Sequence, residues 1–154
     1  MSRTKLAALF AAGTLSLSLI LTATPQDVAV DPAIAAMTPE QLVDARQAAM
    51  KEDGGILRGA KDLSGAEAVA AADTLIRNFT NFPALFAEGS IVGDSKALPV
   101  IWEDWDGFTA IFATALQGAK DMRAAAEAGD AAAYAAALQT IGGTCGQCHQ
   151  NYRS

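Results

Sequence analysis

The sequence from Ala131 to Tyr152, AAAYAAALQTIGGTCGQCHQNY, is rich in alanine and contains both cysteines and the single histidine of the chain. Alanine is the strongest helix former. Gly129 and Asp130, directly before this stretch, are typical of a helix end and a helix cap. We therefore expect a helix from residue 131 to about residue 152, with the cysteines and the histidine in its last turns.

The composition of the 154 residues favours a single all-α domain. Hydrophobic residues make up 51% of the chain and aromatic residues only 6%, and strand-forming residues are sparse, which argues against an all-β fold. Eleven basic and 17 acidic residues give a net charge of −6. A chain this acidic is a poor candidate for binding nucleic acid or an anionic membrane surface.

The beginning of the chain is typical of an export signal. Arg3 and Lys5 precede an apolar run from Leu6 to Leu21, which is shorter than the roughly 20 residues that cross a bilayer as a helix. We predict a signal peptide at residues 1–23, whose cleavage position the residues leave open, and a flexible lead-in at 24–37. The protein is then periplasmic; the alternative is an uncleaved membrane anchor. No membrane span is expected in the mature chain.

Helix start and stop signals divide residues 38–154 into four helices. Capping boxes are predicted at Thr38 with Gln41 and at Ser64 with Glu67. The expected helices are 39–60, 65–81, 99–128 and 131–152, with a long surface connection over 81–98. This order predicts an antiparallel four-helix bundle. The expected inner residues are Leu42, Ala45, Ala49, Met50, Ile56 and Leu57 in the first helix and Trp102, Trp105, Phe108 and Phe112 in the third.

Cys145-Gly146-Gln147-Cys148-His149 matches the attachment signal for covalent haem c. The two thiols each form a thioether with a haem vinyl group, and the adjacent imidazole is then placed to be an axial iron ligand. A thioredoxin-like dithiol would need a preceding strand. A zinc site would need a fourth ligand, and the chain has no other Cys or His. The sequence therefore predicts one haem c held by Cys145 and Cys148, with His149 as proximal ligand.

Three stretches resemble the class II c-type cytochromes, the family that includes cytochrome c′. They are residues 142–153 around the attachment signal, residues 44–51 (DARQAAMK) and residues 97–102 (ALPVIW). The resemblance implies a four-helix bundle, a position for Met50 on the distal side of the haem, and a hydrogen bond from Arg46 to a haem propionate. It also implies a possible homodimer.

The second axial position is left open by the residues themselves. With one histidine, the candidates are Met, Lys, water or no ligand. Met50 is the preferred candidate, Met37 is a weaker one, and Met122, which lies among charged residues, is expected to be peripheral. In the low-spin branch of the family the residue at the Met50 position binds iron, whereas in cytochrome c′ proper a bulky residue there covers an empty site.

These features predict a periplasmic monohaem cytochrome with low-spin His/Met ligation that transfers electrons between redox partner proteins. The alternative is a five-coordinate, high-spin protein that binds NO or CO. Because no acid–base pair or substrate pocket is evident, we do not expect an enzyme. The acidic composition is expected to steer the protein toward basic patches on its partners.

Overall fold

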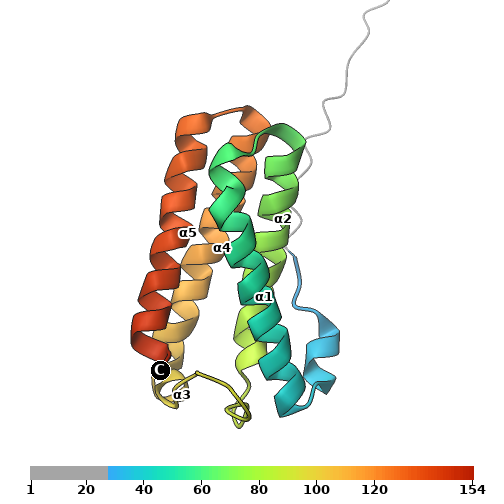
Figure 1. Cartoon of the computed structure of the whole chain (residues 1–154), viewed down its shortest axis with the longest axis vertical. Helices are drawn as coiled ribbons and strands as arrows, with labels where there is room; N and C mark the ends of the chain where they lie inside the picture. The colour runs from blue at the N-terminus through green and yellow to red at the C-terminus, as the bar shows by residue number, and fades with distance from the viewer. Residues whose placement is uncertain (1–27) are drawn as a thin grey trace, which may run out of the picture.

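The computed structural model describes residues 28–154; the expected signal peptide and the first part of the lead-in lie outside the described residues. Four long helices form an antiparallel bundle, as predicted (Figure 1). In chain order the elements are η1 (Pro32–Ala36), α1 (Pro39–Gly59), η2 (Ala60–Asp62), α2 (Gly65–Asn81), η3 (Phe82–Phe86), α3 (Val100–Glu103), α4 (Trp105–Ala128) and α5 (Ala131–Tyr152). No helix among residues 28–154 is long and apolar enough to cross a membrane.

The helix caps explain most of these boundaries. Thr38 Oγ1 accepts from the Gln41 backbone N–H at 3.3 Å, and Gln41 Oε1 accepts from the Thr38 N–H at 2.9 Å, so the first capping box is present. The Asp130 carboxylate accepts two N–H groups at the start of α5, and Gly129 adopts φ +67°. The second predicted box is wrong, because Ser64 makes no side-chain bond at the start of α2.

The predicted third helix is interrupted at Asp104. Its backbone, with φ −125° and ψ 51°, separates the short α3 from α4. The Asp104 carboxylate accepts a hydrogen bond from the Tyr152 hydroxyl at 2.5 Å, and it fills the space where a side chain at Gly107 would stand. The break therefore ties the start of α4 to the end of α5.

The segment between α2 and α3 is not simply a surface connection. Its first residues form η3, and Phe82, Leu85 and Phe86 are buried. The Phe82 ring stacks on Phe112 of α4 at a centroid distance of 5.2 Å. The lead-in likewise contributes the short helix η1 to the structure, with Ile34 buried. Both segments pack against the core because they carry large apolar side chains.

The helices of the bundle do not pack equally closely. Helix α4 packs along both α2 and α5, whereas α1 and α5 stand apart at the end of the bundle where the chain terminates (Figure 1). A Cβ at Gly118 of α4 would lie 3.0 Å from the Ile141 side chain of α5, so glycine permits their close approach. Met122, four residues after Gly118 on α4, is fully buried, which corrects its predicted peripheral position.

The inner face of α1 differs from the prediction. Leu42 is buried as expected, but Arg46 and Asp53 are buried too, with 3% and 5% of their surface exposed. Ala45, Ala49, Met50, Ile56 and Leu57 are only partly buried. In the third predicted helix, Phe108 and Phe112 are buried, whereas Trp105 is 37% exposed and so is not a core residue.

Candidate cofactor site

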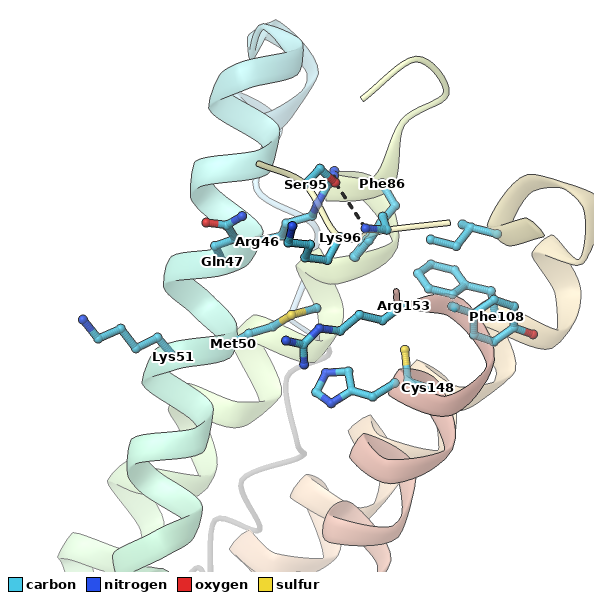
Figure 2. A pocket seen from close by; sticks show the side chains of 14 residues that line it. Arg46, Gln47, Met50, Lys51, Phe86, Ser95, Lys96, Phe108, Cys148 and Arg153 are labelled. Carbon is cyan, nitrogen blue, oxygen red and sulfur yellow. Dashed lines mark hydrogen bonds between the residues drawn. The ribbon is translucent and has the colours of Figure 1, made fainter. Parts of the chain in front are cut away.

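Two cavities lie side by side between α1 and α5. Their volumes are about 360 Å³ and about 170 Å³. Met50 of α1 and Cys148 and His149 of α5 line both of them. Figure 2 shows the side chains of Met50 and Cys148 directed into the space between the two helices. The structure therefore brings the predicted ligands and one attachment cysteine together.

The attachment signal occupies the last turns of α5. Cys145 lines the smaller cavity and Cys148 lines both, and neither forms a disulfide within the described part of the chain. Burial raises the pKa of Cys148 to about 11, and burial and the charge of Asp53 raise the pKa of Cys145. Both side chains are therefore thiols near neutral pH.

His149 sits at the solvent edge of both cavities. Burial and the neighbouring Arg153 guanidinium lower the pKa of its imidazole. The neutral imidazole is thereby favoured, and a neutral imidazole has the nitrogen lone pair that a metal ligand needs.

Phenylalanine side chains contribute to the walls of both cavities. Phe86 and Phe108 line the larger cavity, and Phe79, Phe82 and Phe112 line the smaller one. An apolar space with two thiols, one neutral imidazole and one thioether on its walls matches what haem c requires: a hydrophobic slot, two attachment points and axial donors. The residues present fit the group.

Arg46 also lines the larger cavity, and its guanidinium is held by η3 and by the segment between η3 and α3. Its two terminal nitrogens donate to Leu85 O at 3.0 Å, Ser90 Oγ at 2.8 Å, Ser90 O at 2.7 Å and Ser95 Oγ at 2.8 Å. The guanidinium carbon lies 4.5 Å from the centre of the Phe86 ring. Burial lowers its pKa from the usual arginine value. Arg46 therefore fixes one wall of the cavity.

Asp53 is a site residue that the sequence analysis missed. It lines the smaller cavity, and its Oδ1 accepts from Asn78 Nδ2 at 2.6 Å while its Oδ2 has no partner. Burial is the main reason that its pKa rises to about 7. The spacing of Arg46, Met50 and Asp53, four residues and then three, could have revealed that they share one helix face.

The other two methionines among residues 28–154 lie elsewhere. Met37 lines a third cavity near η1, and Met122 is a fully buried residue of α4, and neither lines the two cavities at the attachment signal. Met50 is therefore the methionine placed beside His149.

Comparisons with known proteins agree with this site. A family model described as Cytochrome C′ matches residues 39–153. The chain is 38% identical over 118 residues to a cytochrome c-556 of Agrobacterium tumefaciens (strain II Chrys), covering 72% of this chain and 95% of that one. It is 34% identical to a cytochrome c′ of Pararhodospirillum photometricum, covering 75% and 98%.

Solved structures show the same fold. A nitric oxide complex of a variant of cytochrome c prime from Alcaligenes xylosoxidans superposes with a TM-score of 0.67 at 29% identity, covering 76% of this chain and 97% of the other. The architecture and the attachment site define a class II c-type cytochrome. The chain belongs to the cytochrome c′ family, and it is a monohaem cytochrome that carries covalently bound haem c.

Proposed function

We propose that this protein is a periplasmic one-electron carrier in which His149 and Met50 are the two axial ligands of the haem iron. Cys145 and Cys148 attach the group to α5. The observation that carries the proposal is that Met50 and His149, on separate helices, line the same two cavities. When bound, haem with His/Met ligation supplies a one-electron couple of raised reduction potential.

The protein's own part is to hold the ligands and to keep water away. Met50 and His149 are carried by long helices, so their separation is set by the packing of the bundle. The phenylalanine side chains give both cavities an apolar part of their wall. Two ligands held in fixed positions favour electron transfer with little rearrangement.

Arg46 is proposed as a hydrogen-bond donor to a haem propionate. All four N–H groups on its terminal nitrogens have partners within the chain. The contact would therefore use its Nε–H or replace the bond to Ser95.

The test of axial ligation is the visible spectrum of the purified holoprotein, oxidised and reduced, together with that of Met50→Ala. We expect a sharp, split band on reduction and a far-red sulfur-to-iron band on oxidation, both of them lost in Met50→Ala. Met37→Leu is the matched control and should leave both bands unchanged. If Met50→Ala had the parent spectrum, Met50 would have no axial role.

Gas binding is the second candidate, because a family member has been solved as a nitric oxide complex. A broad high-spin spectrum of the parent protein, changed by added CO, would favour this function over electron transfer. The remaining proposals are export, a homodimer and the absence of enzymatic activity. N-terminal sequencing of the mature protein tests export, and sedimentation equilibrium tests the homodimer.

A further inference from the structure

The mouth of the larger cavity carries a charge opposite to that of the chain. The lining residues include Arg46, Lys51, Lys96 and Arg153 and no aspartate or glutamate. The whole chain has 11 basic and 17 acidic residues. Basic residues are thus concentrated where the cofactor site opens to solvent.

Three separate segments bring these cations together. Lys51 follows Met50 on α1 and extends away from the cavity (Figure 2). Ala97 forms an isolated antiparallel bridge with Arg153, and the Ser154 N–H donates to the Lys96 carbonyl at 2.9 Å. This pairing places Lys96 and Arg153 at the same edge of the cavity. We call the three exposed residues Lys51, Lys96 and Arg153 the cationic rim.

The cationic rim is not neutralised by the chain. Lys61, Arg77 and Arg123 form ion pairs elsewhere on the bundle. Within residues 28–154, by contrast, no residue of the cationic rim has a carboxylate partner. Unpaired cations grouped around a cavity are available to an external partner.

Asp94 and Asp104 accept hydrogen bonds from neutral side chains and do not line the larger cavity. Asp94 accepts from Gln47 at 3.2 Å, and Asp104 accepts from Tyr152. Haem has two propionates, and these would balance at most two of the four cations that line the larger cavity. Charge therefore remains on the cationic rim in the holoprotein.

We propose that the cationic rim is the docking surface for an acidic redox partner, a protein that presents carboxylates around its own redox centre. The proposal rests on the electron-transfer function above. The acidic net charge led us to expect partners with basic patches, and the proposal reverses this expectation at the face that carries the cationic rim. At physiological salt the Debye length is about 8 Å, so charges at the contact govern docking more than the remote charges of the bundle.

The test compares two inorganic oxidants of opposite charge, hexacyanoferrate(III) and tris(phenanthroline)cobalt(III). Stopped-flow oxidation of the reduced holoprotein is measured from about 10 to about 150 mM salt, over which the Debye length falls from about 30 to about 8 Å. We expect the rate constant with the anion to fall by roughly tenfold and that with the cation to rise. Net charge alone would give both trends with the opposite sign.

Variants identify the surface. Lys51→Gln combined with Lys96→Gln should remove or reverse both salt dependences. Lys61→Gln, which removes a lysine in the η2 turn at the other end of the bundle, should leave them as in the parent protein (Figure 1). The proposal is overturned if the anion reacts faster as salt rises, or if the double variant matches the parent protein.

A peptide titration followed by NMR tests binding at the cationic rim without relying on electron transfer. A hexa-aspartate peptide should shift the amide resonances around Lys51 and Lys96 of the holoprotein at low salt, and a hexa-lysine peptide should not. Shifts confined to other faces would contradict the proposal. A high-spin, CO-binding spectrum would instead overturn the carrier function, and this result is read independently of the peptide titration.

Discussion

Asp53 has a pKa far above the usual value for an aspartate. Its buried carboxyl group has one hydrogen bond, from Asn78, and stands in an apolar cavity. Burial is the largest cause of its high pKa, and the Glu52 carboxylate adds to the rise, whereas Asn78 and the Arg77 guanidinium oppose it. The neutral acid is therefore the form that the fold accommodates.

This pKa predicts that Asp53 makes the protein less stable as the pH rises. The folded pKa of about 7 exceeds the unfolded value of 3.8, so the folded state holds the extra proton between these values. The contribution of Asp53 to the free energy of unfolding should then fall from about pH 4 to pH 7, by a few kcal/mol at about 1.4 kcal/mol per pKa unit. The free energy of unfolding of Asp53→Asn, measured with guanidinium, should lack this fall. At pH 8 it should be higher than that of the parent protein.

Asp44→Asn, on an exposed position of the same helix, is the control and should follow the parent curve. Parallel pH profiles for the parent protein and Asp53→Asn would show that Asp53 does not carry the effect.

At the scale of helices, the sequence correctly predicted the features that depend on neighbouring residues. The Thr38 capping box and the Gly129-Asp130 junction are set by neighbouring residues, so α1 and α5 begin where expected. The break at Asp104 depends on Tyr152, which is 48 residues away, and the burial of Arg46 depends on Ser90 and Ser95. Helix periodicity does not encode such contacts. It therefore predicted Leu42 as an inner residue of α1, but neither the separate helix α3 nor the burial of Arg46.

The contact between α4 and α5 can be tested with a pair of glycine substitutions. In Gly118→Ala the new methyl would meet Ile141 at 3.0 Å and Thr140 at 3.4 Å, and overpacking of this kind costs about 1–3 kcal/mol. Gly142→Ala meets nothing within 4 Å on the exposed side of α5 and should stabilise by about 0.5–1 kcal/mol through helix propensity. Thermal unfolding of the holoproteins measures the change in stability of each variant. Equal changes in Gly118→Ala and Gly142→Ala would rule out a tight α4–α5 contact.

For the molecule as a whole, the sequence indicated the bundle and the attachment signal but not the charge or shape of the opening. Cys145, Cys148 and His149 could be grouped as one candidate site because they lie within one helix, and Met50 was added to it as a predicted inner residue of the first helix and from the family resemblance. Asp53 and the cationic rim could not, since Lys51, Lys96 and Arg153 come from three segments that meet only in the fold. Net charge is an average over the surface and does not describe one face.

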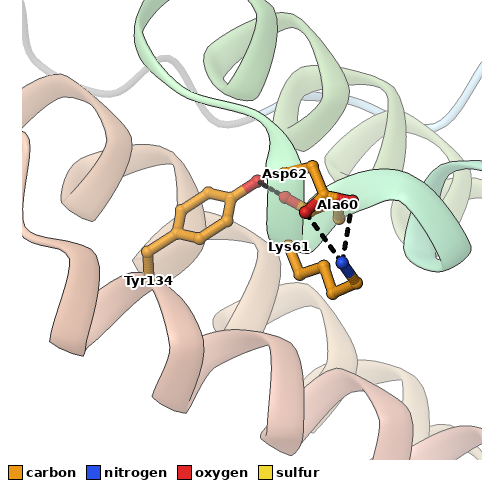
Figure 3. Close-up of polar contacts among 4 residues, drawn as sticks. All are labelled: Ala60, Lys61, Asp62 and Tyr134. Atoms are coloured by element: carbon orange, nitrogen blue, oxygen red, sulfur yellow. Dashed lines mark hydrogen bonds and ion pairs between the residues drawn. The ribbon is translucent and has the colours of Figure 1, made fainter.

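The two ends of the bundle are closed in different ways. At the end opposite the chain terminus, the Tyr134 hydroxyl of α5 donates to the buried Ala60 carbonyl at 3.1 Å, next to the Lys61–Asp62 ion pair (Figure 3). At the other end, α1 faces α5 across the two cavities. Covalent haem c would fill the space between these helices there.

Removing the covalent attachment should therefore loosen one half of α1. In Cys145→Ser combined with Cys148→Ser, we expect a colourless protein whose amides at 46–54 exchange hydrogen at least about tenfold faster than in the holoprotein. Amides of α4, and those around Ala60, should keep their protection because α4 packs on two helices and the Tyr134 contact remains. Hydrogen exchange read by mass spectrometry resolves these segments. Uniform loss of protection over all four long helices would mean that the cofactor holds the whole bundle together rather than α1 alone, and unchanged exchange at 46–54 would mean that α1 needs no support from it.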